Sequence, residues 1–280
     1  MKHFCVRTVS LFHAVRVVNR PEVYQVQMFV TTVGSGKATI VLVHPAGLSG
    51  GDMAPLADAL HAKRCVRVYS RVGWDGGRPT ARNSYYNTQG KQLVEVLRAE
   101  TTPAHLFGWS SGGFVALHAV LEAPELVERL HLYEVPFLSR RDNDGRRHQF
   151  LAMLAWRCLG RNRNSRAAFW RMVSGRETGP TGFELLPAAT RDWLMRQPGP
   201  LLEEVLAGTG EELRGKLDQI KRPVCIMTGT ASSRVTHTAG HRLSEAIRSS
   251  ARQSVAGADH LAPLTMPHAV AESILRTSDR

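Results

Sequence analysis

The sequence has few cysteines and no long apolar run, and each absence argues against a class of protein. Its four cysteines are far apart among the 280 residues and form no C-x-x-C pair: Cys5, Cys65, Cys158 and Cys225. Because two of them lie in apolar, strand-like runs, we expect buried free thiols and a cytoplasmic protein rather than a disulfide scaffold. No apolar run approaches the roughly 20 residues that a bilayer-spanning helix needs, so we expect no membrane span.

The sequence also lacks a nucleic-acid-binding motif, although it is strongly basic. Its net charge is +12, and ten arginines oppose only three carboxylates between residues 139 and 177. No aromatic-interleaved basic motif typical of nucleic-acid-binding modules is present. Such a surplus can attract an anionic substrate or surface, but an exposed, solvated helix face is the simpler interpretation. We therefore expect no nucleic-acid partner.

Two short runs imitate cofactor motifs without meeting their requirements. The run Gly34-Ser35-Gly36-Lys37 lacks the first glycine of a phosphate-binding loop, and Ala38 follows it instead of Ser or Thr, so we predict a hairpin turn. His237 and His241 have the spacing of zinc ligands, but Thr238 stands where a metalloprotease carries glutamate. We therefore expect neither a metal nor an organic cofactor.

Apolar strand-like runs alternate with helical segments along most of the chain. The strand-like runs are Thr39–Val43, Cys65–Tyr69, His105–Phe107, Leu130–Val135, Val224–Thr228 and Gln253–Ala256. This alternation predicts an α/β fold with a mostly parallel, doubly wound sheet and right-handed crossovers. Between 139 and 218 there are amphipathic helical stretches and no convincing strand. We therefore expect a core of residues 28–138 and 219–280, a helical lid of residues 139–218 inserted after Val135, and a poorly ordered N-terminal extension of residues 1–27.

A glycine-flanked serine marks the candidate catalytic centre. Ser110 is the middle residue of the run Gly108-Trp109-Ser110-Ser111-Gly112, between a short apolar strand and the apolar helical segment 114–121. This is the G-x-S-x-G nucleophile elbow, a sharp strand-to-helix turn that exposes the serine at the edge of the sheet. The residues two before and two after the serine must be small because their backbones nearly touch. Gly108 and Gly112 meet this need, which identifies Ser110 as the candidate nucleophile.

Three motifs follow one another in the order of a known superfamily. His44-Pro45-Ala46-Gly47 follows an early strand, the elbow follows a middle strand, and Gly257-x-x-His260 follows the last strand. In this order the chain resembles the α/β-hydrolase superfamily over about residues 28–277. The resemblance implies that His260 is the base that takes the proton of Ser110. It also implies an oxyanion hole formed by the backbone N–H groups of Ser111 and, because Pro45 has none, of Ala46.

The acid of the expected catalytic triad is missing from its usual place. The run Gly229-Thr230-Ala231-Ser232-Ser233 contains no carboxylate, although the superfamily generally carries an acid there. Glu134 can supply the carboxylate that a catalytic histidine requires, because it follows the strand after the elbow. The surrounding Leu132-Tyr133-Glu134-Val135-Pro136 run resembles a subgroup that has L-Y-E-P-P there and serine in place of the usual aspartate. An ion pair between Glu134 and a lid arginine, or Asp259 as the acid, are the alternatives.

These motifs predict a serine hydrolase that cleaves a small-molecule carboxylic ester, thioester or lactone through an acyl-enzyme. Ser110 is the nucleophile, His260 the base and Glu134 the acid. Acyl transfer to another alcohol differs only in which group attacks the intermediate. The alternative from another class is a non-catalytic ligand-binding or partner-binding protein on the same fold, suggested by the missing acid after Gly229.

Overall fold

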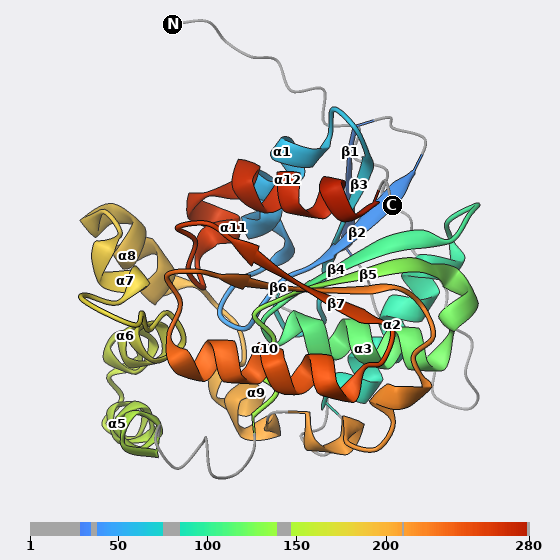
Figure 1. Ribbon diagram of the computed structural model, residues 1–280. Coiled ribbons are helices and arrows are strands. Elements are labelled where there is room, and N and C mark those ends of the chain that lie inside the picture. The colour runs from blue at the N-terminus through green and yellow to red at the C-terminus, as the bar shows by residue number, and fades with distance from the viewer. Residues whose placement is uncertain (1–28, 35–37, 75–84, 139–146, 209, 279–280) are drawn as a thin grey trace, which may run out of the picture.

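Seven strands form one sheet in the computed structural model, which describes residues 29–34, 38–74, 85–138, 147–208 and 210–278. Their order is β1-β3-β2-β4-β5-β6-β7 (Figure 1). The strands are β1 Phe29–Val33, β2 Thr39–Val43, β3 Cys65–Ser70, β4 Ala104–Trp109, β5 Val127–Tyr133, β6 Val224–Gly229 and β7 Ser250–Val255. β1 is antiparallel to β3, and all other neighbours pair in parallel. The predicted mostly parallel, doubly wound sheet is confirmed.

The hairpin predicted near Gly34 is wrong. β1 pairs with β3, from Phe29 opposite Ser70 to Val33 opposite Val66. Because β3 also pairs with β2, it lies between the two strands that a hairpin would have joined. Turn-forming residues favour a change of chain direction, but they do not decide which strand becomes the neighbour. Residues 35–37 lie outside the described part of the chain.

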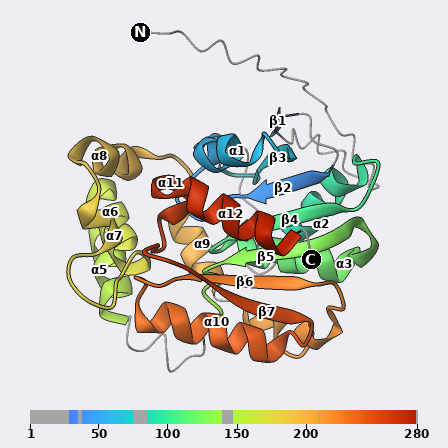
Figure 2. The same cartoon turned by 45° about the horizontal axis from the view of Figure 1, so that its top comes forward.

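Helices cover both faces of the sheet. One face carries α2 Tyr85–Arg98, α3 Gly112–Glu122 and α10 Arg234–Ala246, and the other carries α1 Ala54–Leu60, α11 Ala262–Thr265 and α12 Pro267–Ser278 (Figures 1 and 2). Successive residues of β2 serve the two faces in turn, so that Val41 packs with the first group and Ile40 with the second. All five residues of β2 are buried. Strands of a parallel sheet that is covered on both faces therefore appear in the sequence as unbroken apolar runs.

Five α-helices lie between β5 and β6 in the described part of the chain, and we call residues 147–207, which contain them, the inserted helical segment. They are α5 Arg147–Cys158, α6 Asn162–Val173, α7 Gly182–Leu185, α8 Ala188–Arg196 and α9 Leu201–Ala207. α5 packs on α6 and α6 on α8, stacked at one end of the sheet (Figures 1 and 2). Trp170 joins this stack to the core, because a Cβ on Gly47 would lie 2.7 Å from its ring. The segment is therefore seated on the loop that follows β2.

Short 3-10 turns and loops complete the described chain. The 3-10 turns are Gly50–Met53, Pro124–Leu126, Glu211–Leu213 and Leu217–Gln219. The N-terminal extension predicted at 1–27 and residues 139–146 of the predicted lid lie outside the described residues.

Three cysteines are free thiols in the structure. Cys225 in β6 is buried, as expected, whereas Cys65 at the start of β3 is half-buried and Cys158 is exposed. The expectation that Cys65 is buried is wrong. Cys65 is the first residue of β3, and its side chain is only partly covered there. Within the described ranges, no helix is both long enough and apolar enough to cross a bilayer.

Candidate active site

Ser110 occupies a sharp turn between β4 and α3. Its φ angle of 54° is in the left-handed region, which is uncommon for a residue with a side chain. The neighbouring strand β5 holds this conformation, since the Ser110 N–H donates to the Tyr133 carbonyl at 2.8 Å. A Cβ on Gly112 would lie 2.5 Å from the carbonyl oxygens of Val43 and His44, and a Cβ on Gly108 would lie 2.6 Å from the Gly113 Cα. Both glycines of the motif are therefore required sterically, as the sequence predicted.

Glu134 and His260 meet although 126 residues separate them in the chain. The Glu134 Oε2 lies 3.0 Å from the His260 Nδ1, and the Glu134 side chain is fully buried. Because an ionised carboxylate only accepts hydrogen bonds, Nδ1 carries the proton and donates it. The other ring nitrogen, Nε2, then keeps its lone pair. Glu134 follows the last residue of β5 with a φ of 48°, and this second left-handed turn directs its side chain towards β6.

The second oxygen of Glu134 binds the loop from which the usual acid is missing. Its Oε1 accepts hydrogen bonds from the Gly229 N–H at 2.8 Å and from the Ser232 hydroxyl at 2.5 Å. Ser232 is fully buried. The serine at the position where the superfamily generally carries an acid thus contacts the Glu134 carboxylate. The absence of an acid after Gly229 was the sequence signal for this arrangement.

Asp259, the alternative acid, is bound elsewhere. Its Oδ2 accepts from Arg176 at 2.6 Å and its Oδ1 from the Leu261 N–H at 3.0 Å. The backbone around it is also tied to the core, because the Tyr133 hydroxyl donates to the Asp259 carbonyl at 2.7 Å. Neither alternative of the sequence analysis matches the geometry: Asp259 pairs with Arg176 of the inserted helical segment, and Glu134 pairs with His260.

Ser110, Glu134 and His260 line one small cavity of about 30 Å³, a volume near that of one water molecule. Val173, at the end of α6, also lines it. Ser110 and His260 are 7% and 5% exposed. The inserted helical segment thus contributes Val173 to the cavity where the three predicted side chains come together.

One predicted oxyanion donor, the Ala46 N–H, contacts the hydroxyl of Ser111, the residue that carries the other donor. Ser111 is the N-cap residue of α3, and the Ala46 N–H donates to the Ser111 Oγ at 2.9 Å. This contact between the loop after β2 and the start of α3 spans 65 residues of sequence. This hydrogen bond brings Ala46 and Ser111 together. It also occupies the Ala46 N–H, the group predicted to bind the oxyanion.

A buried arginine that sequence reasoning missed braces this region. Arg71, directly after β3, is 0% exposed, and its Nη1 donates to the Ser111 Oγ at 3.3 Å and to the His44 carbonyl at 3.2 Å. Its guanidinium also forms an ion pair with Glu204 of α9, which is equally buried. Burial opposes the charged form, but the Glu204 carboxylate raises the pKa of Arg71 above its usual value. No local pattern could have revealed a pair whose members are 133 residues apart.

His44 is held neutral beside this pair. Its Nε2 accepts the Arg71 N–H at 3.0 Å, while its Nδ1 lies 2.9 Å from the Pro45 carbonyl and donates to it. Complete burial, followed by the charge of Arg71, lowers the pKa of His44 well below its ordinary value. His44 therefore shapes the loop and does not titrate near neutral pH.

His237 and His241, the pair with the spacing of zinc ligands, belong to no metal site among the described residues. His241 of α10 lies 3.2 Å from Glu245, one turn further along the exposed face of the same helix. In the part of the chain that the structure describes, no group of three or more His, Cys, Asp or Glu side chains is arranged to hold a metal ion.

The family of the protein follows from its sequence match over most of the chain. Residues 40–273 match the model described as the Alpha/beta hydrolase family. The chain belongs to this α/β-hydrolase family. Its first matched residue lies in β2 and its last in α12, so the match includes the elbow, the strand before Glu134 and the loop of His260.

Solved α/β-hydrolase-like structures share its architecture over nearly the whole chain. A bromoperoxidase from Bacillus anthracis superposes with a TM-score of 0.74 at 19% identity, covering 91% of this chain and 96% of the other. An esterase from Exiguobacterium antarcticum gives 0.73 at 18% identity, covering 91% and 96%. An enol-lactonase from Burkholderia xenovorans gives 0.72 at 17% identity, covering 90% and 96%. At such identities the likeness concerns the fold.

Curated relatives match part of this α/β-hydrolase chain. A pimeloyl-[acyl-carrier protein] methyl ester esterase from Xylella fastidiosa is 29% identical over 121 residues, which are 41% of this chain and 44% of that protein. The enzyme of the same name from Chromobacterium violaceum is 32% identical over 106 residues, which are 38% of this chain and 39% of that protein. The chain thus spans less than half the length of the curated relatives it matches.

Proposed function

We propose that this protein is a serine hydrolase that cleaves a small-molecule carboxylic ester, thioester or lactone through an acyl-enzyme intermediate. The observation that carries the proposal is the buried 3.0 Å contact of Glu134 with His260 beside a serine at positive φ. The methyl ester esterases that resemble part of the chain support an ester as the substrate. The chemistry needs no metal and no organic cofactor.

The reaction begins with a proton transfer from Ser110 to His260. The His260 Nε2 takes the hydroxyl proton as the Ser110 Oγ attacks the carbonyl carbon, which forms a tetrahedral oxyanion. Collapse of this intermediate breaks the bond to the leaving alcohol or thiol, and His260 returns the proton to it. Water then attacks the acyl-enzyme, with His260 again as the base, and releases the acid and the free serine.

Glu134 keeps His260 in the productive form. Its buried carboxylate accepts the Nδ1 proton and stabilises the imidazolium when Nε2 becomes protonated. The hydrogen bonds from Gly229 and Ser232 fix Oε1, so that Oε2 stays turned towards His260. A serine at position 232 is therefore compatible with a functional site, because its hydroxyl donates to the Glu134 oxygen that does not face His260.

We assign stabilisation of the oxyanion to the backbone N–H groups of Ser111 and Ala46. The N–H of Ser111 lies at the start of α3, where the helix dipole also favours negative charge. Ala46 must first release the Ser111 hydroxyl, which accepts its N–H in the free protein. Arg71 can retain this hydroxyl when Ala46 lets it go, because it already donates to the same oxygen.

We further propose that the region 139–218 acts as a lid over this site. Three contacts support this role: Val173 lines the cavity of Ser110, Arg176 binds Asp259 beside His260, and Glu204 binds Arg71. A lid with such contacts shields the site from bulk solvent and limits which acyl groups enter. The free thiols of Cys65, Cys158 and Cys225 favour a reducing compartment, and we propose the cytoplasm.

Labelling with a fluorophosphonate tests the nucleophile directly. We expect the folded protein to react and to gain one adduct, which peptide mass spectrometry locates at Ser110. Ser110→Ala should abolish the adduct, whereas Ser111→Ala, which leaves the nucleophile in place, should retain it. A folded protein that does not react would favour the alternative of a non-catalytic binding protein.

A panel of p-nitrophenyl esters of increasing acyl length, with and without a terminal carboxylate, then defines the substrate class. Activity that depends on Ser110 supports the proposed hydrolase. Labelling without turnover of any ester in the panel would restrict the proposal to the reactive serine and contradict the assigned ester chemistry.

A further inference from the structure

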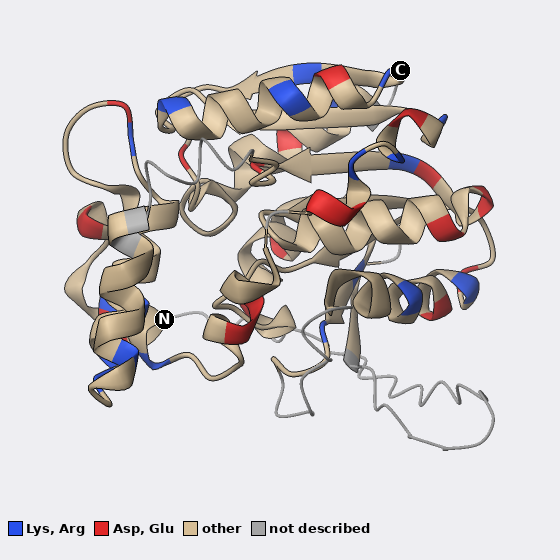
Figure 3. Cartoon of the chain, turned by 90° about the horizontal axis from the view of Figure 1, so that it is seen from below, with Lys and Arg blue, Asp and Glu red and all other residues tan. Residues whose placement is uncertain are grey.

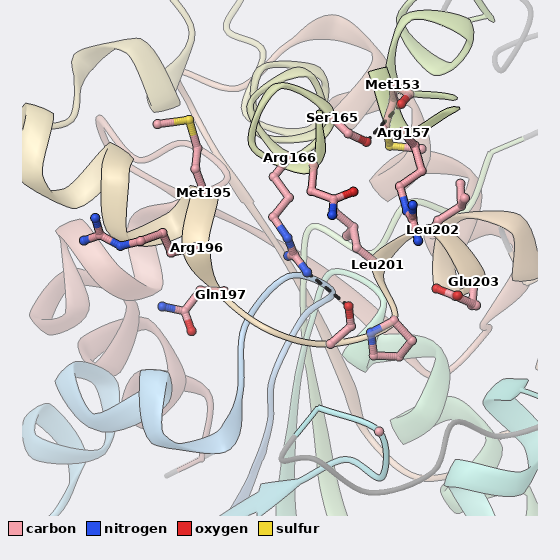
Figure 4. A pocket seen from close by; sticks show the side chains of 14 residues that line it. Met153, Arg157, Ser165, Arg166, Met195, Arg196, Gln197, Leu201, Leu202 and Glu203 are labelled. Carbon is pink, nitrogen blue, oxygen red and sulfur yellow. Dashed lines mark hydrogen bonds between the residues drawn. The ribbon is translucent and has the colours of Figure 1, made fainter. Parts of the chain in front are cut away.

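A second, larger cavity lies within the inserted helical segment (Figure 4). Its volume is about 520 Å³, which falls in the range of small-molecule sites. Helices α5 and α6 form one side, and the chain from the end of α8 to the start of α9 forms the other. Among the described residues, its lining shares none with the cavity of Ser110. It is therefore a separate site.

One guanidinium in this cavity has an unused hydrogen-bond donor. The Nη2 of Arg166 donates to the Gly199 carbonyl at 3.0 Å, and its Nη1 is buried with no hydrogen-bond partner in the structure. Figure 4 shows the side chain extending from α6 into the middle of the cavity, with the bond to Gly199 dashed. Burial lowers the pKa of Arg166, and the nearby Glu203 carboxylate only partly offsets this effect. The charge on Arg166 is thus incompletely compensated.

Arg166 and Arg157 differ from four other arginines of the segment, each of which is paired with a carboxylate. Basic positions are spread along these helices, at the left of Figure 3 as in Figure 1. Arg163 and Arg196 both bind Asp192, Arg171 binds Glu184, and Arg176 binds Asp259. Within the described part of the chain, no carboxylate lies at ion-pair distance from Arg157 or Arg166. Two unpaired cations therefore line the same cavity, against a single lining carboxylate, Glu203.

The rest of the lining combines polar side chains, among them Asn162 and Gln197, with apolar ones. The apolar side chains are Met153 and Leu201, which are 1% and 6% exposed, together with Leu202 and Met195. In Figure 4, Arg157 extends from α5 and Arg166 from α6 among the residues that line the cavity. A ligand that matches this lining carries an anionic group for the two arginines and an apolar body for the walls. Arginine forks bind the oxygens of carboxylate and phosphate in paired hydrogen bonds.

We propose that this cavity binds a small amphiphilic anion, a carboxylate or phosphate group on a short apolar chain, with Arg166 and Arg157 as its ligands. The unused Nη1 donor of Arg166 is the atom that the anion satisfies. The inference does not depend on the proposed ester hydrolysis, because none of these residues lines the cavity of Ser110.

Calorimetric titration of the full chain with defined probes tests the proposal. The probes are octanoate, octyl phosphate, inorganic phosphate and the neutral octanol. We expect saturable binding of octanoate or octyl phosphate, much weaker binding of inorganic phosphate, and no binding of octanol. The affinities of octanoate and octyl phosphate relative to each other identify the preferred head group. Octanol binding as tightly as both anions would overturn the proposal, because the arginines would then contribute nothing.

Matched variants locate the site. Arg166→Met and Arg157→Met should each weaken binding by about tenfold or more, the effect of losing one hydrogen bond to a charged group. Arg163→Met is the control, because Arg163 lies on the same helix but is exposed and paired with Asp192. Its affinity should stay within about twofold of the parent. Equal affinities of all three variants would overturn the assignment.

Two measurements on the unaltered sequence guard against variants that fail to fold. The bound anion should protect Arg166 and Arg157, but not Arg163, from modification by phenylglyoxal, as read by peptide mass spectrometry. Prior labelling of Ser110 with a fluorophosphonate should leave the affinity unchanged. Loss of binding after this labelling would show that the probe occupies the catalytic cavity, and it would overturn the second site without affecting the proposed hydrolase.

Discussion

Replacing Glu134 by glutamine isolates the charge of the proposed acid at nearly constant volume. In the structure, Oε1 receives two donors, the Gly229 N–H and the Ser232 hydroxyl, and Oε2 receives the His260 Nδ1–H. The single oxygen of glutamine should remain with the two donors, because the opposite orientation sacrifices two hydrogen bonds instead of one. Its NH₂ group then faces His260. Nδ1 is forced to accept, Nε2 takes the proton, and the ring can no longer accept a proton from Ser110.

The expected loss follows from this wrong tautomer. A carboxylate-to-amide exchange beside a catalytic histidine lowers kcat by about 10⁴-fold, which corresponds to about 5 kcal/mol of transition-state stabilisation. We therefore expect Glu134→Gln to lower kcat by about 10³- to 10⁴-fold with a smaller change in KM. Glutamine keeps the two hydrogen bonds to the loop, so the protein should remain folded.

Steady-state hydrolysis of an activated ester, with circular dichroism and thermal unfolding alongside, measures this effect. Asp259→Asn is the matched control, since its carboxylate binds Arg176 in a partly exposed ion pair worth about 1 kcal/mol at most. Its kcat should stay within about fivefold of the parent. A folded Glu134→Gln variant with kcat within about tenfold of the parent, or an equal loss in Asp259→Asn, would refute the assignment.

Two other predictions concern the buried charges. Arg71→Met leaves the buried carboxylate of Glu204 without its cationic partner and should lower the free energy of unfolding by about 3–5 kcal/mol, as measured by urea denaturation. Adding Glu204→Gln should restore most of this loss. A double variant no more stable than the single variant would contradict the pairing. Burial, and then the charges of neighbouring basic groups, lowers the pKa of His131 well below its ordinary value. Because the folded state then binds fewer protons than the unfolded state, this histidine's contribution to stability is complete above about pH 6.5 and falls by about 1.4 kcal/mol per unit below it, down to its folded pKa. Urea unfolding at pH 7 and pH 5.5 should therefore show a shallower pH dependence in His131→Gln, and an unchanged slope would disprove this linkage.

The sheet was predictable because its strands are buried on both faces. The run Thr39–Val43 was predicted with its observed bounds, and unbroken apolar runs that alternate with helices are typical of parallel strands covered on both faces. Strand ends were less well defined. β5 ends at Tyr133 rather than Val135, because Glu134 adopts a left-handed conformation that no residue pattern announces. The edge strand β1 was taken for half of a hairpin, since local sequence does not choose between two possible neighbours.

The components of the site were predictable to different degrees. Ser110 follows from glycine spacing, because steric contact leaves no other residue type at positions 108 and 112. His260 was predicted as the base because its motif follows the last strand, as in the superfamily's order of motifs. Glu134 required both a missing acid and a resemblance, and its catalytic role stays a prediction that the observed contact favours. Arg71 could not be found, because a buried charge is recognisable only when its partner is known.

The sequence by itself determined the elements, their order and the residue types that a serine hydrolase requires. These properties depend on neighbours a few positions apart: apolar period, glycine spacing and the absence of an acid after Gly229. Tertiary structure decided which side chains meet. Glu134 reaches His260 across 126 residues, and the pair of Arg71 and Glu204 spans 133. Contacts of this kind exist only after parallel strands bring their carboxyl ends to one edge, so no local pattern encodes them.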